Sequence, residues 1–541
     1  MRAPLDGQHF EVLVIGGGIN GVAIARECAS AGRRTLLVEQ TDFGAGTTSR
    51  STRLIHGGLR YLEQGEIAQV RESLQERQKL LRQYPHLVRR IHFLLALDGN
   101  SRRSALAVRA GLWLYRGLAA GGRVFDLRQE QDRLERLLDS GRRFSIFNFE
   151  DAQCEFPERL VADWLMEAKS AGCEVRNHTR VLAVKVTNGK ATGAVLRDEL
   201  SRKEECVESR WIVNATGPWL DEVCDVSGVR TGDRMIGGIR GSHIVIREFS
   251  DLPRAAVYTE GIDGRPIFVV PWNGQVLVGT TEIADDGDPA RVQASNDEIR
   301  YLLSSLRRLF PQLKILNADI CYAFAGVRPL PRSRGNHASA ITRRHFFHDH
   351  TADGAAGLIS LVGGKLTTAA CAARECAAKI GIKSAGMPVV VTAPGSVVEA
   401  EVDRATKEIV DTAGIDRKSA SAIFEWHGPR SLEIARIAHS ERKLREQLCS
   451  HTEHIIAEAV DAFQSQYAMT LGDVLLRRVP IALDACWSAE CGHAAGARIA
   501  FAMGWSEARA GAELERFELE REAFLQKPET GLEAAELPTL R

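Results

Sequence analysis

The chain has 541 residues, of which 44% are hydrophobic and 26% are charged. This is an ordinary globular composition, so it excludes a disordered or fibrous chain and leaves ample sequence for a core. The 70 basic and 70 acidic residues cancel, which argues against a nucleic-acid partner. Most basic residues are arginines, which suit anion recognition, although a genome-wide bias would produce the same excess.

Neither the cysteines nor the hydrophobic segments indicate export or a membrane span. The 11 cysteines are scattered, and the closest pairs are Cys371/Cys376 and Cys486/Cys491. Neither pair has zinc-ligand spacing, so we expect reduced thiols in a cytoplasmic, reducing compartment and no bound metal. The first residues lack the features of a secretory signal. No uninterrupted apolar run reaches the ~18 residues of a transmembrane helix, so any membrane contact is expected to be peripheral.

The chain opens with a predicted strand–helix–strand unit. Residues 10–15 (FEVLVI) form a short apolar run that predicts a buried parallel strand. A glycine-rich turn and a helical stretch follow, and the helix is expected to end at Gly32. Residues 35–39 (TLLVE) predict a second buried strand. The three elements together indicate a β-α-β unit.

The later segments predict a charged helix, short strands and hairpins, and then a run of helices. Residues 66–92 have a charged helical pattern, and short strands are predicted at 173–179, 180–186, 191–197 and 211–217. Residues 235–325 predict mainly β-hairpins with one helix near 295–310, and residues 358–381 predict a strand, a glycine turn and a helix. After about residue 395 glycine thins out, and helical patterns run to the end.

Residues 101–123 form a basic amphipathic segment that mixes Leu, Trp and Tyr with arginines. The simpler interpretation is a helix that covers the core and holds its arginines in solvent. The alternative is a helix that lies on an anionic membrane surface. Whether Trp113 and Tyr115 are buried is left open.

The first glycine turn predicts a dinucleotide site. Gly16, Gly18 and Gly21 form G-x-G-x-x-G between a strand and a helix. Such glycines permit the tight turn, the approach of a pyrophosphate and close helix–strand packing, and the helix N-terminus offers N–H groups to the anion. Glu39 ends the second strand, where an acid binds a ribose hydroxyl. An acid there favours FAD or NAD over NADP.

Three further segments favour FAD over NAD. Ala215, Thr216 and Gly217 follow a hydrophobic strand, and the hydroxyl-rich loop 47–53 (TTSRSTR) leads into LIHGGLRYLE. A late strand–turn–helix at residues 358–381 could aim a helix N-terminus at the negative charge of a reduced flavin. Each segment alone could be an ordinary turn or cap, but all three after a β-α-β unit indicate a flavoprotein.

The chain resembles the FAD-dependent, aerobic-type sn-glycerol-3-phosphate dehydrogenases, within the D-amino-acid-oxidase-like flavoproteins. The motifs that carry the resemblance span residues 10–381, and the helical tail is similar to that family's C-terminal domain. They are IGGGINGVAIARECASAG (15–32), STRLIHGGLRYLE (51–63), NATGPWLDEV (214–223), RGSHIVI (240–246), VLVGTTE (276–282), AGVRPL (325–330) and GGKLTT (363–368).

The resemblance implies a fold, an activity and partners. The expected fold is α/β, with a Rossmann-like FAD-binding domain, a mixed-sheet substrate (cap) domain and a C-terminal helical domain. The FAD-binding domain would take about 1–90, 150–235 and 325–395, the cap about 91–149 and 236–324, and the helical domain 396–541. The implied reaction oxidises glycerol 3-phosphate to dihydroxyacetone phosphate, with a hydride passing to FAD and electrons to a quinone. The protein would bind the inner face of the cytoplasmic membrane peripherally, and a homodimer is left open.

A phosphorylated substrate needs cations, and several lie in or near the resembling motifs. Arginine suits phosphate because its fork donates two hydrogen bonds. Arg343 could equally be a surface residue, and Arg344 beside it leaves the register open. The candidate phosphate ligands are Arg60, Tyr61, Arg328, Arg343 and Lys365.

Oxidation of a secondary alcohol also requires the hydroxyl proton to leave. His243, on a predicted strand, is the first candidate for the base or for orienting the hydroxyl, and His56 is the second. Arg328 could instead lower the pKa of the alcohol through its charge. The sequence leaves base and electrostatic roles open.

The residues expected to contact FAD come from the motifs above. They are Gly16, Gly18, Asn20, Gly21, Glu39, Thr48, Ser49, Ser51, Thr52, Val181, Ala215, Thr216, Gly217, Trp219, Gly363, Gly364, Lys365, Leu366 and Thr367.

Other activities remain on the same fold. A dehydrogenase of another polyol phosphate, such as erythritol 4-phosphate, would have nearly the same sequence. An amine or amino-acid oxidase would need one carboxylate-binding arginine in place of several phosphate donors. A non-catalytic flavin-binding regulator would be expected to lack one of Arg60, His243, Arg328 or Lys365, and all four are present.

Overall fold

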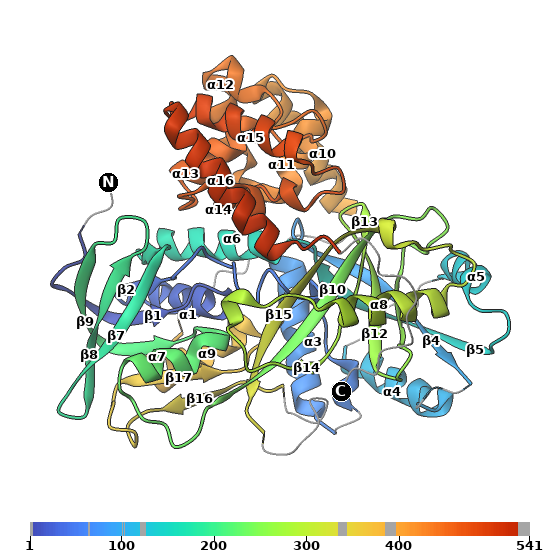
Figure 1. The fold of residues 1–541 in the computed structure, drawn as a ribbon, viewed down its shortest axis with the longest axis horizontal. Helices are drawn as coiled ribbons and strands as arrows, with labels where there is room; N and C mark the ends of the chain where they lie inside the picture. Colours follow the sequence, from blue (N-terminus) through green and yellow to red (C-terminus); the bar gives the residue numbers. More distant parts are fainter. Residues whose placement is uncertain are drawn as a thin grey trace.

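The computed structural model describes residues 4–62, 65–99, 101, 103–119, 126–333, 343–384 and 396–528. Two β-sheets lie side by side, and a bundle of helices from the C-terminal part, orange to red, sits across them (Figure 1). The expected α/β architecture with a helical C-terminal region is confirmed. No helix in the described ranges has both the length and the apolar character of a membrane span.

The first sheet is built on the predicted β-α-β unit. Its strand order is β16-β17-β9-β1-β2-β6, with β7 and β8 joined as an antiparallel extension of β9. β1 pairs in parallel with both β2 and β9, and β17 continues the parallel set. The bounds are β1 Gln8–Ile15, β2 Thr35–Val38, β6 Glu174–Arg176, β7 Thr179–Thr187, β8 Lys190–Asp198, β9 Glu204–Asn214, β16 Phe346–Asp349 and β17 Leu358–Val362.

Alternating side chains of β1 explain how both faces of this sheet are covered. Val12 and Val14 pack with helices α1 (Ile19–Ser30), α6 (Pro157–Ser170) and α9 (Ala369–Lys379). Leu13 and Ile15 point to the opposite face, where β7, β8 and α7 (Leu220–Val226) complete a second core. Burial on both faces is why β2 (TLLV) and β17 (LISLV) are almost wholly apolar.

The second sheet follows the order β14-β10-β13-β12-β11-β4-β5-β3, with β15 on the other side of β10. One face packs on α8 (Asn296–Leu309), and the other on α2 (Leu59–Leu62), α3 (Ile67–Gln83) and α4 (Ala105–Leu118). The bounds are β3 Leu54–Ile55, β4 Val88–Asp98, β5 Phe144–Cys154, β10 Ile236–Arg247, β11 Ala256–Glu260, β12 Pro266–Trp272, β13 Gln275–Gly279, β14 Ile283–Ala284 and β15 Ile320–Pro331.

Two sequence expectations need correction in this region. The helix expected over 66–92 ends at Gln83, because Pro85 follows and disfavours helix before it, and β4 begins at Val88. β4 and β5 pair along their whole length although the sequence did not predict either strand. A short helix α5 (Arg128–Leu137) lies between them in the chain.

The C-terminal helices are anchored on the first sheet's domain by buried charges. Asp42 accepts hydrogen bonds from Arg478 at 2.7 and 2.8 Å and from Arg477 Nε at 2.5 Å. The chain end returns to the second sheet, where Gln526 and Ala323 exchange backbone hydrogen bonds at 2.8 Å. The helices are α10 Ser396–Ala413, α11 Arg417–His427, α12 Ser431–Ser440, α13 Ile456–Gln464, α14 Leu471–Asp473, α15 Ala489–Ala502 and α16 Glu507–Phe524.

Candidate active site

A cavity of about 560 Å³ opens at the carboxyl ends of the parallel strands. Residues that follow β1, β2, β9 and β17 line one side, and residues of β10, β12 and β15 line the other. Ligands of open α/β sheets bind at this edge, because the loops there converge while the strands stay fixed. The two sheets thus enclose a site with a dinucleotide-type wall and a separate opposing wall.

Gly16, Gly17 and Gly21 of the first glycine turn leave no room for a side chain. Gly16 has a φ of +104°, and a Cβ on it would lie 2.7 Å from the carbonyl oxygen of Ala215. A Cβ on Gly21 would lie 1.8 Å from the Gly16 oxygen, so Gly21 serves helix–strand packing and does not line the cavity. Gly17, which sequence reasoning did not single out, is held against Phe43 in the same way.

Glu39 lines the cavity and follows directly after β2, which ends one residue earlier than expected, at Val38. Its Oε2 accepts a hydrogen bond from the Gly17 N–H at 2.7 Å, and its Oε1 accepts one from the Thr41 N–H at 2.9 Å. Burial raises the pKa of this carboxyl, while the backbone N–H groups of Thr41 and Gly17 act in the opposite direction. The carboxylate therefore fastens the glycine turn to the next loop.

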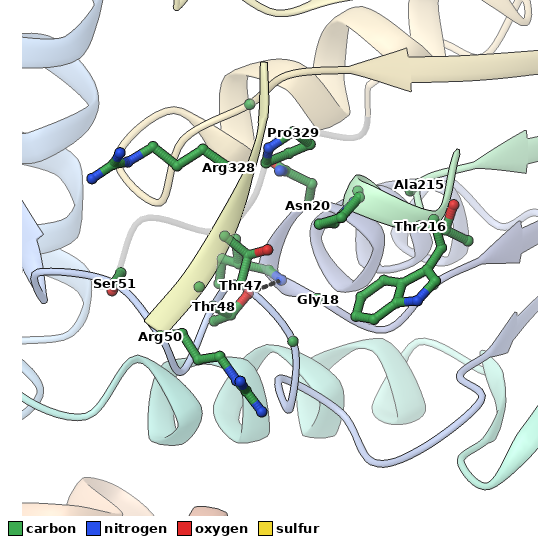
Figure 2. Close-up of a pocket in the computed structure, with 18 of the residues that line it drawn as sticks. Gly18, Asn20, Thr47, Thr48, Arg50, Ser51, Ala215, Thr216, Arg328 and Pro329 are labelled. Carbon is green, nitrogen blue, oxygen red and sulfur yellow. Dashed lines mark hydrogen bonds between the residues drawn. The ribbon is translucent and has the colours of Figure 1, made fainter. Parts of the chain in front are cut away.

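The hydroxyl-rich loop lies beside the start of α1 (Figure 2). Thr48 Oγ1 accepts the Ile19 N–H at 3.1 Å, and Thr47 Oγ1 donates to the Val327 carbonyl at 2.7 Å. Thr47 thereby ties the first domain's loop to β15. Ser49 is buried and donates to the Gly44 carbonyl, so unlike Thr48, Ser51 and Thr52 it does not line the cavity.

The late glycine turn lies directly beside the first one in the cavity wall. Gly363 and Gly364 have φ values of +82° and +104°, and a Cβ on Gly364 would lie 2.4 Å from Asn20 Nδ2. Asn20 Oδ1 is buried and has no hydrogen-bond partner among the described residues. Lys365, Leu366 and Thr367 continue along the wall toward α9. The two turns therefore form one continuous surface with an unsatisfied acceptor in it.

His243 projects from β10 into the opposing wall. Its Nε2 lies 2.9 Å from Thr52 Oγ1, and its ring stacks on Phe324 with a centroid distance of 4.9 Å. Burial, then the charges of Arg328 and Arg53, lower the pKa of His243 to about 3. The imidazole is therefore neutral at ordinary pH, and its buried Nδ1 has no partner within the described ranges.

His56 and Lys365 form a second electropositive corner. Burial and the nearby charges of Lys365 and Arg343 lower the pKa of His56 to about 3. Burial, with Arg343, lowers the pKa of Lys365 to about 7. Lys365 Nζ lies 3.9 Å from the ring centroid of Tyr61. These groups stand close enough to repel one another, which is the arrangement that a bound anion would stabilise.

Two of the predicted arginines, Arg328 and Arg343, also line the cavity. Arg328 reaches Thr280 Oγ1 at 2.8 Å and the Thr281 carbonyl at 3.3 Å, and Figure 2 shows it extending from β15 beside Pro329. Arg343 pairs with Glu282. Arg60 belongs to α2, but its side chain lies outside the described part of the structure.

Most of the predicted site residues therefore line one cavity. Gly21 and Ser49 do not line it, and the side chain of Arg60 lies outside the described part of the structure. The lining set is Gly16, Gly18, Asn20, Glu39, Thr48, Ser51, Thr52, His56, Tyr61, Val181, Ala215, Thr216, Gly217, Trp219, His243, Arg328, Arg343, Gly363, Gly364, Lys365, Leu366 and Thr367.

Sequence reasoning missed other residues of the lining. Arg50 donates to the carbonyls of Val292 and Ala325 at 3.3 and 3.2 Å, and burial lowers its pKa to about 10. Arg265 also lines the cavity, and it pairs with Asp263. Arg50 stood inside the quoted loop 47–53, so its place there was a usable signal. Arg265 stands outside every resembling motif and offered none.

Comparisons with known proteins fit this geometry. Residues 11–370 match the family model described as FAD dependent oxidoreductase, and residues 391–510 match the C-terminal domain of alpha-glycerophosphate oxidase. A glycerol-3-phosphate dehydrogenase of Synechocystis sp. is 38% identical over 88% of this chain and 89% of its own. The chain belongs to the FAD-dependent glycerol-3-phosphate dehydrogenase family.

Two further comparisons concern a relative named for a different polyol phosphate and a solved structure of the same fold. D-erythritol 1-phosphate dehydrogenase of Brucella abortus is 36% identical over 66% of this chain and 71% of its own. The glycerol-3-phosphate dehydrogenase of Bacillus halodurans, solved in complex with FAD, superposes with a TM-score of 0.76, 23% identity and 96% coverage of both chains. The last match shows that the three-part fold described above is shared.

The cofactor of this family is FAD, and the cavity fits it. The glycine turn leaves backbone N–H groups at the start of α1 open to a pyrophosphate, and Glu39 stands where a ribose would lie. The unsatisfied Asn20 Oδ1 can accept a hydrogen bond from a group bound between the two glycine turns. The N-terminus of α9 contributes a second positive helix end.

Proposed function

We propose that the protein oxidises sn-glycerol 3-phosphate to dihydroxyacetone phosphate and passes the electrons to a quinone. The observation that carries this proposal is the meeting of cationic side chains with a neutral, buried histidine in the cavity that fits FAD. The names of the relatives support the substrate, and the cations supply what a phosphate needs.

The cations are proposed to serve two ends of the substrate, its phosphate and its reacting hydroxyl. Lys365 and Arg343 are proposed to bind the phosphate, because their mutual repulsion is relieved by an anion. Arg328 lies on the same wall as His243 and lowers the pKa of that histidine through its charge. It is proposed to favour the developing alkoxide of the substrate hydroxyl. Arg60 and Tyr61 stay candidate phosphate ligands.

The oxidation removes a hydride from carbon and a proton from the hydroxyl. Bound FAD supplies the hydride acceptor. His243 Nε2 is proposed to accept the proton or to orient the hydroxyl, since it is neutral and already contacts a hydroxyl, that of Thr52, at 2.9 Å. A phosphate dianion nearby would raise the pKa of His243 from about 3 and so favour proton acceptance. His56 remains the second candidate for this role.

Anaerobic bleaching of the flavin absorbance tests the substrate. Glycerol 3-phosphate, D-erythritol 1-phosphate, erythritol 4-phosphate and sarcosine are added in turn to the purified, FAD-loaded protein. We expect glycerol 3-phosphate to bleach it fastest. The four-carbon polyol phosphates are the second candidates, because one relative at 36% identity is named for such a substrate. Bleaching by sarcosine alone would move the protein to the amine oxidases, and no bleaching by glycerol 3-phosphate would exclude the proposal.

We propose that α4 brings the enzyme peripherally to the inner face of the cytoplasmic membrane, where a quinone is available. Tyr115 anchors the helix, because its hydroxyl is buried against Asp151 at 2.8 Å and the Gly57 N–H at 2.9 Å. Leu106 and Trp113 stand seven positions apart, on one face of the helix, and are 78% and 79% exposed. Arg109 is exposed on the same helix. An apolar face with basic residues suits an anionic lipid surface.

Sedimentation with anionic vesicles tests this surface. We expect the protein to sediment with vesicles at low salt and to be released at high salt, and Trp113→Ser to weaken the binding. Phe501→Ser is the matched control, because Phe501 is 72% exposed but belongs to the helical domain at the other side of the molecule from α4 (Figure 1). Equal loss in both variants would argue against α4 as the contact.

A further inference from the structure

A cluster of sulfur and imidazole ligands lies in the helical domain, away from the cavity. Cys449 and His451 come from the segment before α13, and Cys491 lies in the first turn of α15. One donor atom from each of the three residues lies within 4.8 Å of the other two. The sequence hides this grouping, because about forty residues separate its two halves.

The spacing of the donors matches a tetrahedral metal site. Cys491 Sγ lies 3.5 Å from His451 Nδ1. Zinc bonds of ~2.3 Å to sulfur and ~2.0 Å to nitrogen at a tetrahedral angle place those two atoms ~3.5 Å apart. The side chains of Cys449 and Cys491 also contact each other, so a single cation placed among the three donor atoms would contact all of them.

A fourth ligand stands next to the cluster. The Cys486 carbonyl oxygen lies 3.5 Å from Cys491 Sγ, and the Cys486 Sγ lies 3.9 Å from the His451 carbonyl oxygen. Cys486 is exposed, so its side chain can turn toward the cluster. Three cysteines and one histidine form one of the ligand sets of structural zinc sites.

The surroundings favour a thiolate at Cys491 and leave a path for the ion. Ser488 caps α15, and its hydroxyl donates to Cys491 Sγ at 3.5 Å. The N-terminus of that helix stabilises negative charge on sulfur. Cys449 and Cys491 are 3% and 2% exposed, whereas His451 and Cys486 face solvent, so the cluster is shielded on one side and open on the other.

We propose that Cys449, His451, Cys486 and Cys491 bind one zinc ion, with the thiol protons released to solvent. The soft thiolates and the imidazole select this class of ion over calcium or magnesium. A second grouping, His348, His350 and Asp353, carries no such proposal, since both histidines already share Asp353 Oδ2 at 2.7 and 2.9 Å.

The site would hold two segments that support the domain interface. Asp484 accepts a hydrogen bond from Asn273 at 2.8 Å, and the Leu483 carbonyl accepts one from Gln275 at 2.9 Å. Both residues precede Cys486 in the chain, and Asn273 and Gln275 belong to the β12–β13 hairpin region. Zinc would therefore fix the turn on which the helical domain meets the second sheet.

Metal content of the full-length, FAD-loaded protein tests the site. The protein is produced with zinc in the medium, dialysed and analysed for zinc per chain. We expect about one zinc per chain in the wild type and in Cys206→Ser/Cys321→Ser, which removes two half-buried thiols outside the cluster. Cys449→Ser/Cys491→Ser is expected to lose it. Equal zinc in both double variants would overturn the proposal, as would a metal-free wild type with a Cys449–Cys491 disulfide.

An exposed ligand gives a variant that keeps the fold. His451→Asn changes a solvent-facing side chain, so we expect normal FAD content and a zinc affinity lower by more than the ~10–100-fold that an outer-shell loss costs. Cobalt in place of zinc should give thiolate-to-metal absorption in a difference spectrum, weaker in Cys486→Ser than in the wild type. Unchanged affinity in His451→Asn, or no such absorption, would overturn the assignment.

Discussion

The cavity and the junction beneath the helical domain both bury ionisable groups, but the pKa shifts favour the neutral forms of those groups in the cavity and the charged forms at the junction. In the cavity, burial among cations lowers the pKa values of His56 and His243 to about 3 and that of Lys365 to about 7. At the junction, burial alone would lower the pKa of Arg477 and raise that of Asp473, but the neighbouring opposite charges outweigh burial, so the pKa of Arg477 is raised and that of Asp473 is lowered.

The difference lies in the partners. Asp42, Asp473, Arg477 and Arg478 form ion pairs in which donors meet acceptors within one buried group. The charges nearest the cavity histidines are cationic instead. A buried ionisable group beside an opposite charge is stabilised in its charged form. A cation buried near other cations is destabilised until an anion binds beside it. The four junction residues therefore balance one another's charge. In the cavity, Lys365 and the two histidines lie near further cations although Arg343 also pairs with Glu282, and a bound anion would stabilise this arrangement.

The largest expected effect breaks the junction. Asp42→Asn removes the carboxylate shared by Arg477 and Arg478, and breaking a buried pair costs about 3–5 kcal/mol. We expect a lower unfolding midpoint in denaturant. Asp403→Asn is the control, because its pair with Arg417 is about 70% exposed on both sides and is worth less than about 1 kcal/mol. Equal midpoints for the two variants would refute the contrast between buried and exposed pairs.

A smaller effect is expected in the cavity. Arg328→Ala removes the cation that is proposed to favour the developing alkoxide, so it should lower kcat/KM for glycerol 3-phosphate by about 10- to 150-fold, as expected for the loss of a hydrogen bond to a charged group of about 1.5–3 kcal/mol. FAD content and the unfolding midpoint should change little, because the arginine serves an absent anion. Arg332→Ala, exposed just beyond β15, is the control. Joint loss of FAD and activity would contradict the substrate role.

The sequence predicted much of the cavity but not the junction beneath the helical domain. The glycine turns, Glu39 and the hydroxyl loop are local patterns whose purpose is set by neighbours in the chain, so they were predicted with their cofactor. The partners of Asp42 stand more than 400 residues away, at Arg477 and Arg478, and no local pattern joins them.

Strands β4 and β5 were missed for a related reason. The charged residues Arg89 and Arg90 at the start of β4 gave 66–92 a helical appearance, and β5 also carries charged residues such as Glu150. The strands form because each pairs with the other across 11 residues, and long-range pairing of this kind overrides local propensity. The grouping of Cys449, His451 and Cys491 likewise depends on tertiary contacts alone.

The pH dependence of substrate binding sharpens the contrast further. Because Lys365 has a pKa of about 7 without an anion, a bound phosphate must raise it, so binding takes up a proton above pH ~7. We expect KM to rise by up to about tenfold per pH unit above that point, and also below about pH 6, where the phosphate loses its second charge.

Lys365→Met removes the alkaline rise, while Lys379→Met at the exposed end of α9 keeps it. Steady-state kinetics across pH, with FAD content checked at each pH, give the measurement. An alkaline rise that persists in Lys365→Met would assign it to another group.

The smallest effect is expected at the edge of the junction. His178 Nε2 lies 2.9 Å from Asp473 Oδ2; burial lowers its pKa, but the charge of Asp473 outweighs this and raises it overall. A raised pKa in the folded state adds stability that is full below the unfolded value of ~6.5 and is lost as pH rises through the folded value. His178→Gln keeps a donor but removes that charge. Its loss of stability relative to wild type should therefore be larger at pH 5.5 than at pH 8.5, in both cases smaller than that of Asp42→Asn.

Denaturant unfolding at the two pH values measures this loss of stability, with His9→Gln, at an exposed histidine on β1, as the control. A difference that grows with pH would mean that His178 stabilises the junction as a neutral group, so that the rule drawn from Asp473 and Arg477 would stop at the acidic and guanidinium groups.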